Sequence, residues 1–263
     1  MPEIVTDDVA VTDGDTAAMG LFMVRSYGSF RRGFESAAGL FVVTMLLMSQ
    51  MMTELRAEPA LVREGGPIRI VALGDSLTAG HELLYKDGFP AQLQRALRER
   101  GIDTVVANAG VSGDTSSGGR DRLEWSVPPD TQAVIVELGA NDALRGIDPA
   151  ITRAALEDII TRLQTSGIKV MLAGMYAIGN YGPDYAAKFN AIYPELAKKY
   201  NVPLYPFFLE GVAGDARLNK PDGIHPTAEG VSTIVKNITP TVEAFLRDSK
   251  LVAEAGQPQS KSN

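Results

Sequence analysis

The chain has 263 residues, which suits one domain with an extension, and its 45% hydrophobic content is enough for a sizeable core. The net charge is −7 and no basic stripe occurs, so nucleic acid is not an expected partner. The chain has no cysteine, which excludes disulfides, a cysteine nucleophile and cysteine-ligated zinc. It has only two histidines, His81 and His225, and we expect neither a metal nor a cofactor.

The first part of the chain does not read as part of an enzyme core. We expect residues 1–35 to be a disordered extension, or a mis-assigned start if Met19 or Met23 is the true first residue. Residues 36–53 carry no charge and follow three arginines, which is typical of an export segment.

We therefore interpret residues 36–57 as the hydrophobic region of a signal peptide or as a membrane anchor. A buried helix of the main domain is the alternative. Cleavage near Ala57 is slightly favoured, because the uncharged run is short for a membrane span. The sequence thus predicts a periplasmic or secreted protein, with anchoring to the inner membrane through residues 36–53 as the other possibility, and a linker over residues 58–66.

From residue 67 onward, apolar runs typical of strands alternate with amphipathic helical patterns. This alternation predicts a mostly parallel sheet of five strands between two layers of helices, in a domain over residues 67–250. A disordered tail is expected over 251–263. Pro194 and Pro240 are expected to bend or break their helices. The predicted strands are 68–73, 104–108, 133–138, 169–173 and 202–205, and the predicted helices are 89–100, 116–125, 149–165, 185–200 and 227–246.

The first strand ends in the small, polar stretch Gly74-Asp75-Ser76. The carboxyl ends of strands in open α/β sheets are where ligands bind, so Ser76 is a candidate nucleophile. The glycine spacing does not match a P-loop, a dinucleotide fingerprint or the G-x-S-x-G elbow. A turn without chemistry is the alternative interpretation.

Three further polar clusters follow the later strands, at residues 108–115, 139–142 and 222–226. In a parallel sheet these strand ends meet at one edge. A serine hydroxyl needs a base to take its proton, and His225 is the better candidate, with Asp222 three residues earlier to orient it. His81 is the competing base and is otherwise expected on the surface.

Acyl transfer also needs donors for the oxyanion of the tetrahedral intermediate. The main-chain N–H groups of Ser76 and Gly113 and the side-chain amide of Asn141 are the candidates. Local structural roles are the alternative for these residues. Asp75, Asp114 and Asp142 are expected only to hold loops through hydrogen bonds.

Four blocks occur in the order Gly74-Asp75-Ser76-Leu77, Gly113, Gly139-x-Asn141-Asp142 and Asp222-x-x-His225. In this order they resemble the GDSL/SGNH hydrolases, and most of all the bacterial periplasmic thioesterase/lysophospholipase and arylesterase subgroup. The resemblance covers about residues 68–247. It implies a three-layer α/β/α, flavodoxin-like fold and a catalytic core of Ser76, Gly113, Asn141 and His225.

The resemblance also implies a serine ester hydrolase that acts on small acyl esters and thioesters, such as aryl esters, acyl-CoA and lysophospholipids. A carbohydrate O-deacetylase with a small acetyl pocket is the alternative enzyme, and a non-catalytic binding module the third. An apolar substrate groove is expected from side chains in loops at the active edge, with ordinary packing as its alternative. These groove residues are Leu144, Met175, Tyr176, Ile178 and Tyr181.

Overall fold

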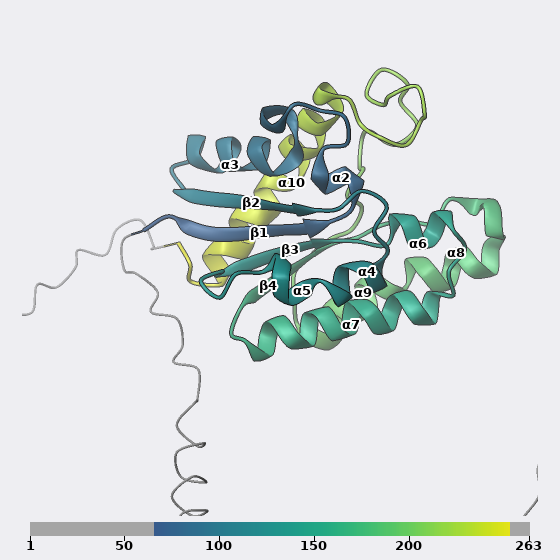
Figure 1. The fold of residues 1–263 in the computed structure, drawn as a ribbon, viewed down its shortest axis with the longest axis horizontal. Coiled ribbons are helices and arrows are strands. Elements are labelled where there is room, and N and C mark those ends of the chain that lie inside the picture. The colour runs from purple at the N-terminus through teal and green to yellow at the C-terminus, as the bar shows by residue number, and fades with distance from the viewer. Residues whose placement is uncertain (1–65, 253–263) are drawn as a thin grey trace, which may run out of the picture. The chain divides into compact units, whose positions relative to one another are not determined.

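The computed structural model of the protein describes residues 66–252 (Figure 1). The predictions for residues 1–35, 36–57 and 253–263, and for the linker up to residue 65, lie outside the described part. Within residues 66–252, none of the helices is long and apolar enough to cross a membrane.

A five-stranded sheet forms the centre of the described domain, and every strand pairing in it is parallel. The strand order is β2-β1-β3-β4-β5, the flavodoxin-like order, which confirms the predicted fold class. The chain order reverses between β1 and β3, and such a switch point opens a crevice at the carboxyl ends of the strands. The strands are β1 (Ile68–Gly74), β2 (Thr104–Gly110), β3 (Ala133–Glu137), β4 (Lys169–Ala173) and β5 (Leu204–Tyr205).

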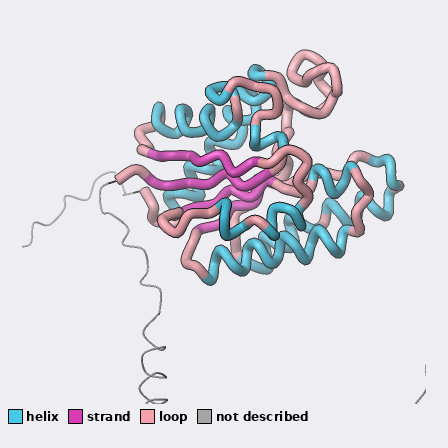
Figure 2. The backbone as a smooth tube through the Cα atoms, viewed as in Figure 1, coloured by secondary structure: helices cyan, strands magenta, loops and turns pink. Residues whose placement is uncertain are grey.

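Helices cover both faces of the sheet (Figures 1 and 2). On one face α3 packs against α10, and on the other α7 packs against α4 and α9. The helices are α2 (Ser76–Ala79), α3 (Phe89–Glu99), α4 (Ser116–Asp121), α5 (Leu123–Ser126), α6 (Ala140–Leu144), α7 (Pro149–Thr165), α8 (Pro183–Asn190), α9 (Ile192–Tyr200) and α10 (Ala228–Asp248), with short 3-10 helices at Tyr85–Asp87 and Gly179–Tyr181.

The central strands explain why the sheet is rigid where the site is built. All five residues of β3 are buried, and in β1 only Arg69 is exposed. Side chains on both faces of these strands pack against helices, as expected for a parallel sheet with two covered faces. Full burial of each large apolar side chain stabilises the fold by about 1.5–3 kcal/mol.

The structure divides two of the predicted helices and leaves a third continuous. The helix expected over 116–125 is two helices, α4 and α5, which meet at Arg122. The helix expected over 185–200 is two helices, α8 and α9, which meet at Ala191. Pro194 lies in the first turn of α9, where no intrahelical N–H is needed. By contrast, α10 continues through Pro240, so the predicted interruption there is wrong. Pro240 lies on the exposed side of α10, where the carbonyl left without its helical partner can bond to water.

Candidate active site

The nucleophile turn follows β1 at the switch point of the sheet. Ser76 is the first residue of α2, and the Asp75 carboxylate caps this helix by accepting a hydrogen bond from the Leu77 N–H at 2.9 Å. The turn lies directly on the end of β2: a methyl group added to Gly110 would be 2.2 Å from the main-chain nitrogen of Ala79. Glycine at position 110 therefore lets α2 approach the sheet closely.

Ser76, His225 and Asp222 form one hydrogen-bonded succession. The Ser76 Oγ lies 2.9 Å from His225 Nε2, although 149 residues separate them in the chain. On the other side of the ring, His225 Nδ1 lies 2.8 Å from Asp222 Oδ2. With a proton on Nδ1, the free Nε2 can accept the serine proton. The structure thus brings together the three residues that the sequence predicts as nucleophile, base and orienting acid.

The Asp222 carboxylate is fixed by its own loop as well as by the imidazole. Its Oδ1 accepts hydrogen bonds from the N–H groups of His225 at 3.0 Å and Ile224 at 2.9 Å. The His225 N–H, the His225 ring and the Ile224 N–H hold the pKa of Asp222 well below its ordinary value. Asp222 is therefore ionised at neutral pH and can stabilise an imidazolium at His225.

The predicted oxyanion donors lie on the neighbouring loops. Gly113, in the loop after β2, has a φ of +86°, and its carbonyl accepts a hydrogen bond from Arg145 at 2.8 Å. Asn141, in α6 after β3, donates its side-chain amide to Asp75 Oδ2 at 3.2 Å. The Asp75 carboxylate therefore fixes which end of the Asn141 amide carries the donors, and one amide hydrogen remains for another acceptor.

Two buried carboxyl groups lie beneath the nucleophile turn. Burial raises the pKa of Asp75 to about 6, against the opposing effect of its hydrogen bonds from Leu77 and Asn141. Glu137, the last residue of β3, is 1% exposed and accepts a hydrogen bond from the Thr78 hydroxyl at 2.7 Å. Burial and the nearby Asp75 raise the pKa of Glu137 well above its ordinary value. Asp75 thus does more than hold a loop, because it contacts both α2 and Asn141.

Asp142 and Asp114 have the structural roles expected of them, through contacts more distant in sequence than predicted. Buried Asp142 accepts hydrogen bonds from the Ser116 N–H, the Ser116 hydroxyl and the Thr152 hydroxyl. Asp114 pairs with Arg122 at 2.6 Å, and Arg122 also donates to the carbonyl of Gly74 at 2.8 Å. These bonds fix the loops after β2 and β3 to each other and to the end of β1.

Four of the five predicted groove residues lie at the surface of the active edge. Tyr176, Ile178 and Tyr181 are about half-exposed, and the Tyr181 hydroxyl donates to the carbonyl of half-buried Leu144 at 3.1 Å. Met175 is a correction: it is 3% exposed and belongs to the hydrophobic core. Gly174 continues the pairing of β4 with β5 through its N–H bond to Tyr205, so Met175 still lies inside the sheet layer rather than in an open loop.

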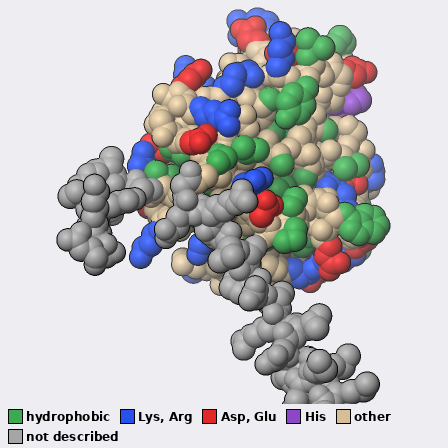
Figure 3. Space-filling model, turned by 60° about the vertical axis from the view of Figure 1, so that its left-hand side comes forward, with side chains coloured by type: hydrophobic (Ala, Val, Ile, Leu, Met, Phe, Trp, Pro, Cys, Tyr) green, Lys and Arg blue, Asp and Glu red, His purple; other side chains and the backbone are tan. Residues whose placement is uncertain are grey.

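The surroundings of the base include two residues whose role the sequence does not reveal. His81 was expected simply on the surface, but its ring centroid lies 4.4 Å from that of His225, and its side chain is 36% exposed. Lys220, in the loop that carries His225, contacts the turn at His81. Histidine atoms are visible at the molecular surface in Figure 3, in agreement with the partial exposure of His81, so solvent reaches this residue.

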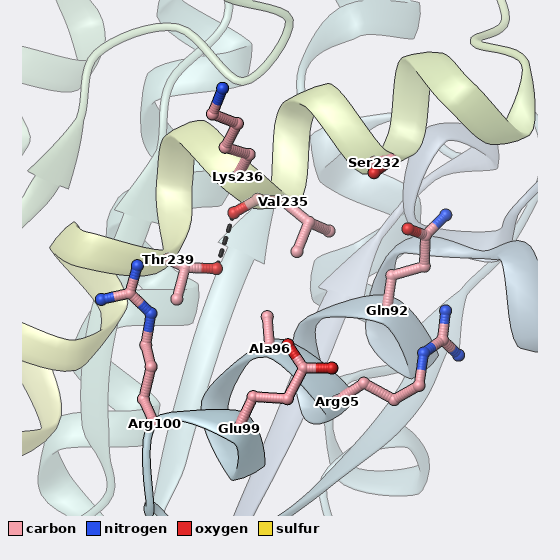
Figure 4. A pocket seen from close by; sticks show the side chains of 9 residues that line it. All are labelled: Gln92, Arg95, Ala96, Glu99, Arg100, Ser232, Val235, Lys236 and Thr239. Carbon is pink, nitrogen blue, oxygen red and sulfur yellow. Dashed lines mark hydrogen bonds between the residues drawn. The ribbon is translucent and has the colours of Figure 1, made fainter.

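Another hollow lies away from this edge. A groove of about 340 Å³ between α3 and α10 has Arg95, Arg100 and Lys236 around it, together with Glu99 (Figure 4). None of the predicted site residues lines this groove. Among residues 66–252, no group of three or more His, Asp and Glu side chains is arranged to hold a metal ion.

A flavodoxin-like sheet that carries a Ser–His–Asp succession at its carboxyl edge defines a serine hydrolase. Comparison with known proteins gives the family. Residues 72–232 match the model of the GDSL-like Lipase/Acylhydrolase family. The chain belongs to this family.

Individual relatives agree with this assignment. Esterase TesA of Pseudomonas aeruginosa is 37% identical over 187 residues, which cover 71% of this chain and 93% of that protein. Thioesterase 1/protease 1/lysophospholipase L1 of Escherichia coli is 38% identical over 161 residues, which cover 61% of this chain and 76% of that protein. The crystal structure of AlinE4, an SGNH-hydrolase family esterase, superposes with a TM-score of 0.58 at 44% identity, covering 69% of this chain and 98% of that chain.

Proposed function

We propose that this ester hydrolase uses Ser76 as its nucleophile, His225 as general base and acid, and Asp222 as the residue that orients and stabilises the imidazole. The observation that carries the proposal is the unbroken succession from Ser76 Oγ to His225 Nε2, at 2.9 Å, and from His225 Nδ1 to Asp222 Oδ2, at 2.8 Å. The first distance is within the reach needed for proton transfer, and the second is that of the hydrogen bond that orients the imidazole.

The chemistry follows from this geometry. Ser76 Oγ attacks the carbonyl carbon of an ester or thioester while its proton moves to His225 Nε2. The imidazolium then gives that proton to the leaving alcohol or thiol, and an acyl-serine remains. Water, deprotonated by His225, attacks the acyl-serine, and the products are a carboxylic acid and regenerated Ser76.

The tetrahedral intermediates need donors for their oxyanion. We assign these to the N–H groups of Ser76 and Gly113 and to the Asn141 side chain. The hydrogen bond from Arg145 to the Gly113 carbonyl supports this, because it fixes the peptide of the loop after β2. The bond from Asn141 to Asp75 supports it as well, because it directs the amide nitrogen toward the nucleophile turn.

The substrate side of the site favours acyl chains. Nine large hydrophobic side chains are exposed in the described part of the chain, and two of them, Trp125 and Ile151, are on α-helices. The other seven lie in loops or short 3-10 helices that follow strand ends: Leu84, Tyr85, Val111, Tyr176, Ile178, Tyr181 and Ile224. This apolar rim, together with relatives named esterase, thioesterase and lysophospholipase, supports acyl esters and thioesters with apolar chains as the substrates.

Location outside the cytoplasmic membrane is the last part of the proposal. It rests on the uncharged run of residues 36–53, since the family match begins only at residue 72. We expect this segment to be cleaved near Ala57, so that the mature enzyme acts in the periplasm or is secreted. A retained inner-membrane anchor is the alternative.

The test of the nucleophile is Ser76→Ala with nitrophenyl esters of increasing chain length, palmitoyl-CoA and a lysophospholipid as substrates. Turnover should fall by a factor on the order of 10⁶, because the nucleophile and base act as a unit. A fluorescent alkyl phosphonate should label the wild-type serine covalently and leave the variant unlabelled. Ser232→Ala, at an exposed position of α10, is the matched control, and it should keep both activity and labelling. A Ser76→Ala enzyme with more than a few per cent of wild-type turnover contradicts the assignment.

A further inference from the structure

Lys220 links the loop of the base to the turn of the nucleophile. Its side chain is 14% exposed, and Nζ donates to the carbonyl of His81 at 2.5 Å and to Glu82 Oε2 at 3.2 Å. Its main-chain N–H donates to the carbonyl of His225 at 2.7 Å. Lys220 therefore binds the loop that carries His225 through its main chain, and it binds the turn after α2 through its side chain.

That turn is itself bonded to the nucleophile. The N–H groups of Gly80 and His81 both donate to the Ser76 carbonyl at 3.1 Å. Glu82, which follows, has a φ of +54°, a left-handed conformation that is strained for a residue with a side chain. Such strain persists only where surrounding contacts hold it, and the Lys220 ammonium supplies two of them.

His81 packs on the face of the base. The two imidazole centroids are 4.4 Å apart, and the ring planes are tilted by 36°. The His81 Nε2 lies 3.7 Å from Glu82 Oε1, so the ring of His81 also has a carboxylate beside it. An aromatic face against the His225 ring limits the rotation of that ring and stabilises the positive charge that His225 gains when it takes the serine proton.

We propose that Lys220 and His81 are positioning residues that hold the His225 imidazole against Ser76 before substrate binds. The inference rests on the catalytic roles proposed above for Ser76 and His225. Glu82 is part of the arrangement, because its carboxylate balances the Lys220 ammonium beside an imidazole that must become cationic. Displacement of a catalytic group by about 1 Å costs up to about 100-fold in rate, so such contacts matter for turnover more than for binding.

The first experiment compares Lys220→Met, which keeps the unbranched apolar stem without the ammonium group, with Lys220→Arg, which keeps the charge and hydrogen-bond donors. We expect Lys220→Met to lower kcat by about 10- to 100-fold with KM changed by less than about threefold. Lys220→Arg should recover most of the loss. Lys198→Met, at an exposed position of α9, is the control and should match the wild type. A Lys220→Met kcat within twofold of wild type, at unchanged Tm, overturns the proposal.

The second experiment uses His81→Phe, which keeps an aromatic face, and His81→Ala, which removes it. We expect His81→Phe to stay within about twofold of the wild-type kcat and His81→Ala to fall about five- to tenfold below it. If Lys220→Met does not fold, this pair decides, and equal kcat values for the two His81 variants overturn the stacking role.

A spectroscopic readout separates positioning from general loss of structure. Because the chain has two histidines, ¹⁵N-histidine labelling gives only two imidazole spin systems. The NMR resonance of the proton between His225 Nδ1 and Asp222 should broaden in Lys220→Met while Tm stays near the wild-type value. An unchanged resonance contradicts positioning through Lys220.

Ser76→Ala is assayed in parallel. If Ser76→Ala is active, the proposed function fails; if it is inactive while Lys220→Met matches the wild type, only this further inference fails.

Discussion

Among single residues, the carboxyl groups near the site have opposite surroundings. Asp222 is about 42% exposed at its side chain and accepts two main-chain N–H groups, which lower its pKa. Asp75 and Glu137 are buried, and burial raises the pKa of each of these two carboxyl groups. The outer carboxylate can thus support a positive imidazole at neutral pH, whereas burial favours the neutral form of Glu137, which accepts a hydrogen bond from Thr78 of α2.

Asn141 gives a residue-scale prediction about catalysis. We expect Asn141→Ala to lower kcat by about 10²- to 10³-fold with a smaller change in KM, because an oxyanion donor acts mainly in the transition state. Steady-state kinetics with a nitrophenyl ester measures both constants. A change confined to KM would make Asn141 a substrate-binding residue instead.

Glu137 gives a prediction about pH and stability. The unfolded chain releases the Glu137 proton near the ordinary pKa of 4.5, whereas the folded protein keeps that proton to higher pH. Between the pKa of Glu137 in the unfolded chain and its higher pKa in the folded protein, the folded state binds one proton that the unfolded state has released. The free energy of unfolding therefore falls as the pH rises through this range. Glu137→Gln cannot ionise and should escape this fall, so the free energy of unfolding of the variant should increase relative to that of the wild type as the pH is raised above 4.5.

Urea unfolding at several pH values measures this difference. Glu99→Gln, on the exposed side of α3, is the control and should follow the wild-type curve. Parallel curves for Glu137→Gln and the wild type would show that Glu137 ionises no differently in the folded and unfolded states.

At the scale of secondary-structure elements, the close approach of α2 to β2 determines where the nucleophile lies. A methyl group on Gly110 would meet main-chain atoms of Ala79 at 2.2 and 2.7 Å, and main-chain atoms cannot move aside as a side chain can. We therefore expect Gly110→Ala to lower the free energy of unfolding by about 2 kcal/mol or more, and Tm by about 5 °C or more. At Gly179 an added methyl group meets nothing within 4 Å, so Gly179→Ala should leave Tm unchanged in the same melting experiment.

The elements could largely be predicted from the sequence, because strands and helices in this fold have distinct apolar periodicities. The apolar run before Gly74 indicates β1, and the break between α8 and α9 follows from Pro194. The continuity of α10 through Pro240 could not be predicted, because it depends on which side of the helix faces solvent.

The chemistry-bearing residues could also be predicted in part. Ser76, Asp222 and His225 come together as expected, because parallel strands end at one edge. Arg145 and Lys220 could not be found in this way, since each acts through a carbonyl group of a residue distant in sequence. Every residue type has a main-chain carbonyl oxygen, so a side chain that binds one does not require a particular partner residue. Such a contact therefore leaves no recognisable motif in the sequence. Glu137 did leave a signal, as a charged residue at the end of an otherwise apolar strand.

For the whole molecule, the described domain contains every proposed catalytic residue. We expect a chain shortened to begin at Glu58 to be fully active, because Ser76, Gly113, Asn141, Asp222 and His225 all lie between residues 66 and 252. Turnover of a nitrophenyl ester by this shortened chain measures that, and mass spectrometry of the enzyme from cell fractions gives its mature N-terminus. Failure of the shortened chain to fold would assign residues 36–53 to the domain core and contradict export.

The 149-residue separation of Ser76 from His225 has a consequence for how activity appears in time. The proposed nucleophile follows the first strand of the domain, and the proposed base lies just before its last helix. On this proposal, a nascent chain on the ribosome has no functional site until residues 66–225 of the 66–252 domain, more than four-fifths of it, have been synthesised and His225 can dock beside α2. Premature termination anywhere before Asp222 gives an inert product, so ester cleavage reports completion of the whole fold in refolding or translation assays.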